Sequence, residues 1–309
     1  MPRSRRFRVT APQFRWFALA DFISMILIVI SGAAVRLTDS GLGCPDWPNC
    51  STSVVTGPVG YHSVIEFGNR TVTVLLVILT AVSVVAAYLR DPRRKDLIWL
   101  TWALVGGIVA DAVLGAFVVY SKLNPWLVAI HMLSSMGMVI VGATLYHRSK
   151  YLYGDGAEAV IRDQHFYRVA RFLWIPYAIV IMAGTVTTGA GPHPGSISQQ
   201  HHARRIDIAF SSAAWIHSVA AVTFIALIAG LLLAIWHTNA PAPLQLGVRR
   251  LALIGLLQAA IGFSQYWLHD PAWLVELHIL GALSVTIGVT QLNLRQVARA
   301  RIPGTQRTK

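Results

Sequence analysis

Charged side chains are scarce in this chain. Asp, Glu, Lys and Arg make up only 13% of the 309 residues, whereas hydrophobic residues make up 55%. An ordinary soluble domain carries about 25% charged residues, so the composition excludes that class. Several apolar runs exceed the roughly 20 residues that cross a bilayer. The sequence therefore predicts a polytopic membrane protein.

The N-terminus lacks the features of a cleavable signal peptide. It starts with the basic stretch MPRSRRFRVTAPQFR, and no short apolar region with a cleavage site follows. We therefore expect a retained cytoplasmic tail over residues 1–13. Cysteine is also rare. The chain holds only Cys44 and Cys50, and both lie in one predicted loop.

The apolar runs predict an all-α protein with eight membrane helices. The expected helices cover about 14–36, 64–89, 97–120, 126–147, 170–190, 212–237, 249–268 and 272–294. We divide the chain into an N-terminal half (14–147), a cytoplasmic linker (148–169), a C-terminal half (170–294) and a second cytoplasmic tail (295–309).

Acidic residues are few, and the basic residues are unevenly placed. The net charge is +13, which alone would be compatible with nucleic-acid binding. However, 21 of the 26 Lys and Arg residues fall in the two tails, the linker and the turns on one side of the predicted helices. The positive-inside rule then places both termini in the cytoplasm, with the chain in the cell membrane. The basic charge favours orientation and lipid contact, and we expect no nucleic-acid partner.

One short stretch occurs twice. Residues 126–131 read WLVAIH and residues 273–278 read WLVELH, at an offset of 147. The same offset relates Gly115 to Gly262 and Asp111 to Gln258, and a one-residue slip sets Asn69 opposite His217. A repeat of this length in an apolar chain predicts two pseudo-symmetric four-helix bundles.

Three histidines fall inside predicted helices near their outer ends. His131 stands six residues after Pro125, roughly 9 Å into the membrane, and His278 lies at the same depth by the repeat. His217 enters on a neighbouring helix at a similar depth. Two imidazoles facing each other in a four-helix bundle commonly hold a haem iron from both sides. A single buried histidine, in contrast, is more often a hydrogen-bonded core residue.

The N-terminal half lacks the second histidine. Asn69 takes the place of His217, with Glu66 and His62 on the same helix face. Glu66 is an acid at the membrane edge, where it fits either catalysis or an ion pair with Arg70, four residues on. His62 is an alternative iron ligand, but it lies further out and fits a residue at a loop end.

Other polar residues leave alternatives open. Cys44 and Cys50 are expected in an oxidising setting, where they fit a structural disulfide or an exchangeable redox pair. Asp111 stands in mid-helix and fits either a hydrogen-bond acceptor for a neighbouring helix or a proton carrier. His193, in the turn GAGPHPG, fits a solvated loop residue.

These motifs together resemble the haem A synthase family over about residues 15–295. The resemblance rests on VRLTDSGLGCPDWPNC (35–50), IEFGNR (65–70), GTVTTGAGPHPG (184–195), QYW with WLVELH (265–278), and the helices of His131 and His217. It implies an enzyme with two four-helix halves that oxidises a methyl group of haem O to a formyl group. The product, haem A, serves terminal oxidases. The partners implied are the haem O-producing enzyme and an oxidase assembly route, and the sequence is compatible with an oligomer.

The resemblance also assigns roles to residues. It implies that His217 and His278 hold a b-type cofactor haem, and that the substrate haem lies beside His131 and Glu66. The family usually has E-x-x-H-R where this chain has Asn69 before Arg70. His131 is therefore the one substrate-haem ligand at a matching position, and an iron with an open face would suit oxidation.

Two other functions compete with this enzyme. A membrane b-type haem protein that only transfers electrons would carry ligands near both faces, whereas all candidate ligands here lie near the outer face. A transporter built on repeats would show helices broken at mid-membrane, which the sequence does not predict. Both comparisons favour the enzyme.

Overall fold

The computed structural model describes residues 8–44, 47, 50, 60–150, 164–196, 203–238, 240 and 242–297. Its elements in chain order are β1 (Val9–Thr10), α1 (Ala11–Leu37), α3 (Tyr61–Leu89), β2 (Arg90–Asp91), α4 (Lys95–Tyr120), α5 (Pro125–Lys150), α6 (Gln164–Phe172), α7 (Trp174–Ala190), α8 (Phe210–His237), α9 (Ala242–Trp267) and α10 (Ala272–Val297).

Within these ranges, eight helical spans are long and apolar enough to cross a membrane. The predicted all-α class with eight membrane helices is thus confirmed. The fifth span, Arg168–Ala190, contains a short interruption at Leu173 between α6 and α7. The backbone hydrogen bonds from Leu173 to Val169 and from Tyr177 to Leu173 continue across it.

Several helices extend further than the sequence indicates. α9 begins at Ala242, well before the expected residue 249. α5 runs on to Lys150 and α6 starts at Gln164, so helix occupies both ends of the expected linker. Hydropathy marks only the apolar middle of a helix, and the added residues of α5 and α6 are mostly polar or basic. The added first turns of α9 are mostly apolar but contain Gln245.

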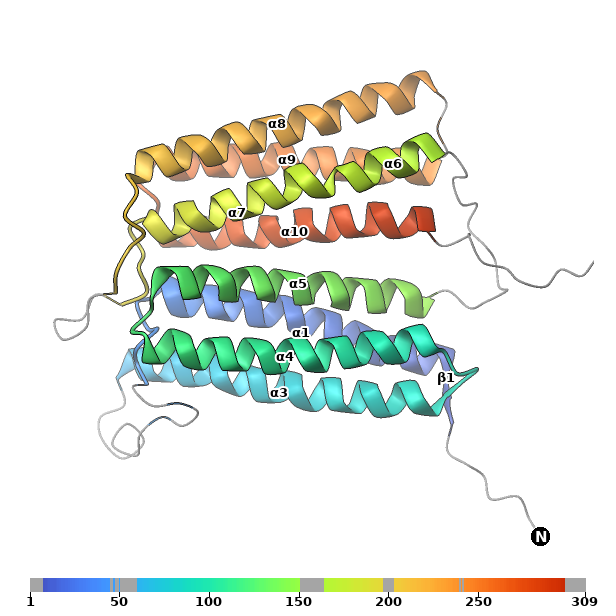
Figure 1. Ribbon diagram of the computed structural model, residues 1–309, viewed down its shortest axis with the longest axis horizontal. Helices are drawn as coiled ribbons and strands as arrows, with labels where there is room; N and C mark the ends of the chain where they lie inside the picture. Colours follow the sequence, from blue (N-terminus) through green and yellow to red (C-terminus); the bar gives the residue numbers. More distant parts are fainter. Residues whose placement is uncertain are drawn as a thin grey trace, which may run out of the picture.

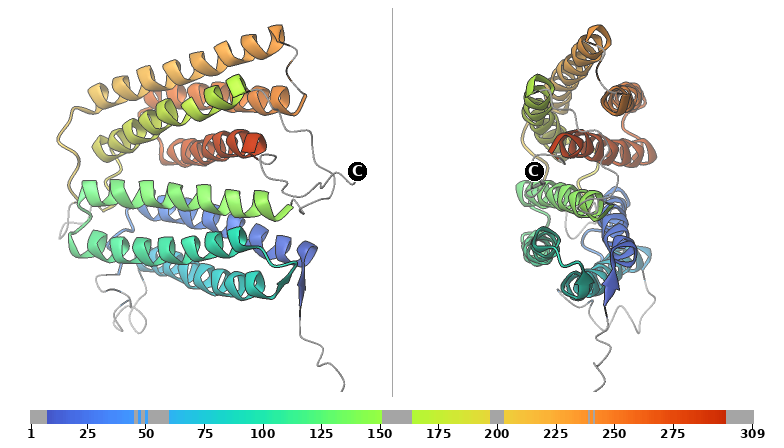
Figure 2. Two further views of the ribbon diagram at one scale, coloured as in Figure 1. Left: turned by 45° about the vertical axis from the view of Figure 1, so that its right-hand side comes forward. Right: turned by 90° about the vertical axis from the view of Figure 1, so that its right-hand side faces the viewer.

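The helices form two groups that lie side by side (Figures 1 and 2). α1, α3, α4 and α5 pack together, and α7, α8, α9 and α10 make up the other group. α5 and α10 pack against each other where the groups meet, and α1 also contacts α10. The two copies of the repeated stretch therefore begin the two helices at the centre of the molecule.

Each group has its own apolar core. Fully buried side chains of the first include Phe14, Met25, Leu76, Leu104 and Val139, and those of the second include Ile228, Leu251 and Val289. Leu283 of α10 belongs to the core of the first group, so the groups are not separated by a polar layer. The hydroxyls of Tyr177 and Thr286 lie 2.7 Å apart across the α7–α10 contact.

The outer surface of the helices carries many large apolar side chains. Large side chains point outward, and Trp99 and Trp236 are 76% and 75% exposed. A water-soluble monomer rarely exposes so much contiguous apolar surface, whereas lipid covers it without cost. The protein is therefore a multi-pass membrane protein.

The first helix, α1, begins at a capping motif that can be recognised in the sequence. Thr10 caps α1 in a capping box with Gln13, whose amide oxygen accepts from the Thr10 backbone N–H at 2.9 Å. Pro12 stands in the first turn, where its missing N–H costs nothing.

The end of the molecule that carries the N-terminus is tied together by charge and backbone pairing. β1 pairs in parallel with β2, and Arg8 forms an ion pair with Asp91. Asp96 accepts from Arg94 at 2.6 Å and lies 3.7 Å from Arg148. We refer to this end, with the α3–α4 turn and the start of α9, as the basic end.

Candidate functional site

Two histidines of the second group lie close together near the end of the molecule opposite the basic end, which we refer to as the outer end. His217 of α8 and His278 of α10 have ring centroids 6.1 Å apart, with ring planes at 84°. Within the described part of the chain, the Nδ1 atoms of both rings are buried and have no hydrogen-bond partner. The structure therefore brings together the two histidines that the sequence places at similar depth.

The spacing of the pair suits one metal between the rings. A metal–imidazole bond is about 2 Å and the ring nitrogen lies roughly 1 Å from the ring centre, so two imidazoles on one iron have centroids about 6 Å apart. In the described ranges, no three His, Cys, Asp or Glu side chains gather as a bare ion would require. The residues therefore fit a group that brings its own equatorial ligands, such as a porphyrin.

Glycines make room for these rings. A methyl group on Gly184 of α7 would lie 2.9 Å from Cε1 of His217, and one on Gly262 of α9 would lie 3.2 Å from Cε1 of His278. Gly115 stands at the repeat-related place beside His131, at 3.8 Å. The two groups thus set a glycine against the equivalent histidine in the same way. Sequence reasoning noted the Gly115 and Gly262 match but missed Gly184.

His131 of α5 has a charged neighbour that His278 does not. Its Nδ1 lies 3.6 Å from Oδ1 of Asp111 on α4, within ion-pair range although long for a hydrogen bond. Oδ2 of Asp111 accepts from the Ser135 hydroxyl at 2.7 Å. Asp111 therefore accepts a hydrogen bond from a neighbouring helix, which is one of the two roles that the sequence left open for it. The repeat-related Gln258 instead donates to the backbone carbonyl of His278, at 3.0 Å.

Asn69 is held by α1 in the same half. Its Oδ1 accepts from the Ser31 hydroxyl at 2.7 Å. His62, at the start of α3, lies with Nδ1 3.0 Å from the Ser40 hydroxyl. Both residues therefore contact the segment around the end of α1, and His62 lies one to two turns further out than Asn69, as the sequence indicates.

Glu66 connects α3 to the cysteine loop. One carboxylate oxygen accepts from Arg70 at 2.6 Å, and the other accepts from the Cys44 backbone N–H at 2.7 Å. Arg70 also donates to the Cys44 carbonyl at 3.3 Å. The side chains of Glu66 and Arg70 are only 7% and 16% exposed. The ion pair is thus present, and it orients the carboxylate rather than leaving it free.

The cysteine loop is closed by a disulfide between Cys44 and Cys50, with Cα atoms 4.9 Å apart, which confirms that pairing. A methyl group on Gly43 would lie only 2.5 Å from the His62 carbonyl oxygen, so the loop packs directly on the start of α3. The loop and Glu66 form one unit at the outer end.

We expect the double variant Cys44→Ser with Cys50→Ser to lose stability but keep the histidine pair. A disulfide closing so short a loop contributes about 2–3 kcal/mol. Thermal unfolding of the purified protein should therefore shift downward, while the visible spectrum of any haem held by His217 and His278 stays unchanged. Mass spectrometry without reductant should find the linked peptide in the wild type. Free thiols there, or loss of the spectrum in the variant, would contradict this assignment.

Arg36, near the end of α1, joins the two groups at the outer end. Its guanidinium donates to the carbonyl oxygens of His193 and Thr188, at 2.9 and 2.8 Å. The His193 ring contacts the Asp270 carbonyl oxygen at 2.8 Å. The interpretation of His193 as a solvated loop residue is therefore wrong. Sequence reasoning missed Arg36, which the unusual position of an arginine on the outer face could have singled out.

Glu276 was also missed. Both of its carboxylate oxygens are buried and, among the described residues, have no hydrogen-bond partner. It stands two residues before His278, where the first copy of the repeat has Ala129. Comparison of WLVAIH with WLVELH would have found it. A buried polar group of this kind needs a partner from water or a bound molecule.

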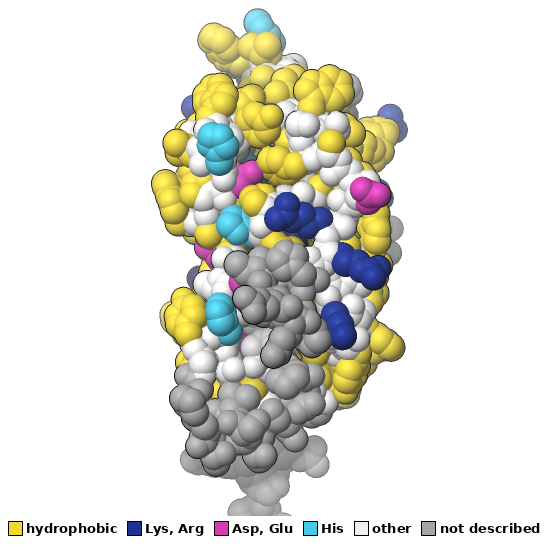
Figure 3. All heavy atoms as spheres, turned by 90° about the vertical axis from the view of Figure 1, so that its left-hand side faces the viewer, with side chains coloured by type: hydrophobic (Ala, Val, Ile, Leu, Met, Phe, Trp, Pro, Cys, Tyr) yellow, Lys and Arg dark blue, Asp and Glu magenta, His cyan; other side chains and the backbone are white. Residues whose placement is uncertain are grey.

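The outer end, shown in Figure 3, thus collects most of the chemistry-bearing side chains. Histidine side chains lie on both groups there, and Lys and Arg side chains gather between them. The candidate site consists of the histidine pair in one group and of His131, Asp111 and the Glu66 unit in the other.

Comparison with known proteins identifies the family. The family model of COX15-CtaA, described as cytochrome oxidase assembly protein, matches residues 15–58 and 60–290. The chain belongs to the COX15-CtaA family. The matched region includes the cysteine loop and all three helical histidines, so the resemblance drawn from these motifs is confirmed.

Several curated relatives of this chain carry the name haem A synthase. The chain is 32% identical over 118 residues to that of Lysinibacillus sphaericus, covering 38% of each chain. It is 33% identical over 120 residues to that of Geobacillus thermodenitrificans, covering 38% of this chain and 37% of the relative. With that of Staphylococcus saprophyticus it shares 26% over 181 residues, or 57% of each chain. The alignments therefore span between about a third and three fifths of these relatives.

Proposed function

We propose that this protein is a haem A synthase, which oxidises a methyl group of haem O to a formyl group and so supplies haem A to terminal oxidases. The observation that carries the proposal is the difference between the two groups of helices. One holds the pair His217 and His278, whereas in the other the repeat-related His131 lies beside a carboxylate. A protein that only carried electrons would have no need for the second arrangement.

The C-terminal half, residues 170–294, would hold the cofactor haem b. His217 and His278 would be the two axial ligands, since their rings face each other at the spacing of one iron. Gly184 and Gly262 leave space beside the rings. An iron with two protein ligands is saturated and supplies one-electron transfer rather than chemistry on a substrate.

The N-terminal half, residues 14–147, would bind haem O. His131 is its proposed axial ligand, because it is the repeat-related counterpart of His278. Asn69, whose oxygen already accepts from Ser31, is not proposed as a ligand. With one protein ligand, one face of the substrate haem stays open for the oxidation.

Asp111 would orient His131 for this role. A carboxylate beside Nδ1 holds the proton on that nitrogen and turns Nε2 toward the metal, and such partners raise the basicity of the ligand. Ser135 holds the other carboxylate oxygen of Asp111 and so fixes its direction. Asp111 is thus a positioning residue rather than a catalytic one.

We expect Asp111→Asn to lower haem A production about 10- to 100-fold, the usual effect of removing such a partner. A less basic imidazole stabilises the ferric state less, so the reduction potential of the first-half haem should rise. A redox titration followed by visible spectroscopy measures this. The matched control is Gln258→Ala at the repeat-related position, which should leave that potential unchanged. An unchanged reduction potential in the Asp111→Asn variant would show that Asp111 does not position His131.

Glu66 is the proposed proton donor or acceptor beside the substrate haem. It is an acid near the outer end of the same half, where water is scarce and a carboxyl can exchange protons. Its contacts with Arg70 and the Cys44 N–H equally support a structural role as the anchor of the cysteine loop. The variants that separate these roles are treated in the Discussion.

The same proposal indicates the partners of the protein and its place in the cell. Its substrate would come from the enzyme that makes haem O, and its product would pass to a terminal oxidase during assembly. In the sequence, most of the Lys and Arg residues fall in the two tails, the linker and the turns on one side of the membrane helices, which supports cytoplasmic termini in the plasma membrane.

A further inference from the structure

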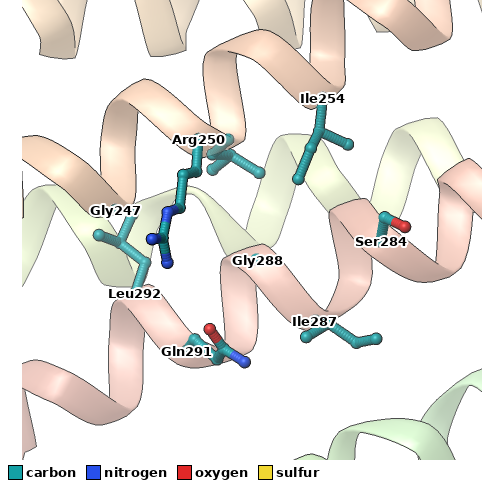
Figure 4. A pocket seen from close by; sticks show the side chains of 9 residues that line it. Gly247, Arg250, Ile254, Ser284, Ile287, Gly288, Gln291 and Leu292 are labelled. Carbon is teal, nitrogen blue, oxygen red and sulfur yellow. The ribbon is translucent and has the colours of Figure 1, made fainter.

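A cavity lies between α9 and α10, away from the candidate site (Figure 4). It holds about 200 Å³. The residues that line it are Gly247, Arg250, Leu251, Ile254, Ser284, Ile287, Gly288, Gln291 and Leu292. It is partly open to the outside of the molecule.

The lining combines one cation with an apolar floor. Arg250 and Gln291 supply hydrogen-bond donors, and aliphatic side chains and glycines supply most of the rest. The Ser284 hydroxyl donates to the Leu280 carbonyl oxygen at 3.0 Å. Gly288 lets the helices approach closely there, since a methyl group on it would lie 3.0 Å from Cδ1 of Leu251. The cavity therefore combines the hydrogen-bond donors of Arg250 and Gln291 with an apolar lining beside them.

Arg250 has no acidic partner in the part of the chain that the structure describes. It lies eight residues after the start of α9 at Ala242, about 12 Å from the basic end. Side chains of a helix lean toward its N-terminus, so the guanidinium extends toward that end and the headgroup level. Figure 4 shows it directed past Gly247 toward Leu292.

We propose that this cavity binds one anionic phospholipid of the leaflet at the basic end. The phosphate accepts from Arg250 and Gln291, and an acyl chain lies along Ile254 and Ile287. Charge complementarity carries the assignment, because no acidic residue lines the cavity. Basic pockets between transmembrane helices on this side of a membrane are known to bind anionic headgroups.

The test uses the purified full-length protein reconstituted in equal parts of phosphatidylglycerol and phosphatidylcholine. Native mass spectrometry counts the lipids that remain bound. We expect the wild type to retain phosphatidylglycerol preferentially, and Arg250→Gln to lose at least about fivefold in its retention.

The matched control is Arg249→Gln. Arg249 precedes Arg250 on α9, is exposed, contacts Gln245 at 3.5 Å and does not line the cavity. This variant should retain the lipid as the wild type does, and circular dichroism should show equal helicity in all three proteins. Equal retention of the two lipids by the wild type, or equal losses in the two variants, would overturn the proposal.

Discussion

Alanine at position 217 or 278 is expected to remove most of the low-spin haem b spectrum from the purified protein. The two rings lie on different helices with centroids 6.1 Å apart, and on our proposal each would supply one side of the same iron. Loss of either leaves five-coordinate iron, which is high-spin, or no haem at all. Visible absorption and electron paramagnetic resonance of each variant measure the effect.

The control for this experiment stands on the same helix. His237 ends α8 at the opposite end of the membrane, where its ring stacks on Trp236 at 6.1 Å. His237→Ala should keep the low-spin spectrum in full. A wild-type spectrum in both His217→Ala and His278→Ala would show that the pair does not hold the haem.

The second large effect is expected for Glu66→Gln. Without an exchangeable proton at this position, cells that make haem O should accumulate haem O or its alcohol and little haem A, while the protein still folds and holds haem b. Chromatography of extracted haems, with the protein quantified in the same membranes, gives the result. Normal haem A output at wild-type protein levels would exclude the proton role.

The variant Arg70→Gln separates a proton-transfer role of Glu66 from a role in anchoring the cysteine loop. It removes the ion pair but leaves the Glu66 carboxylate and its bond from the Cys44 N–H. If Glu66 only anchors the cysteine loop, both variants break the same buried pair, lose about 3–5 kcal/mol and fail together. If Glu66 exchanges protons, Arg70→Gln retains much more haem A output per folded protein than Glu66→Gln does.

The sequence predicted the parts of this protein that depend on local pattern. Eight apolar runs indicated eight membrane helices, because a bilayer demands a fixed length of apolar helix. The repeat of WLVAIH and WLVELH at one offset set His278 at the depth of His131, and the position of His217 at a similar depth indicated the pair with His278. The spacing of Cys44 and Cys50 in one outer loop likewise indicated their disulfide.

The contacts between distant segments could not be predicted in the same way. Arg36 bonds to carbonyl oxygens of residues more than 150 positions away, and nothing in its local sequence indicates this. The approach of Asp111 to His131 depends on how α4 rotates against α5. The cavity at Arg250 lies where α9, which begins at Ala242, meets α10 at Gly288, and hydropathy does not detect such a contact.

Production of haem A is the most direct test of the central claim. The full-length chain would be expressed in cells that make haem O but contain no haem A synthase, and extracted haems would be identified by chromatography and mass. We expect haem A in cells expressing the wild type, and haem O alone in cells expressing His131→Ala at equal protein level. Haem O alone with the wild type, although the protein is folded and carries haem b, would contradict the account and leave an electron-transfer protein in its place.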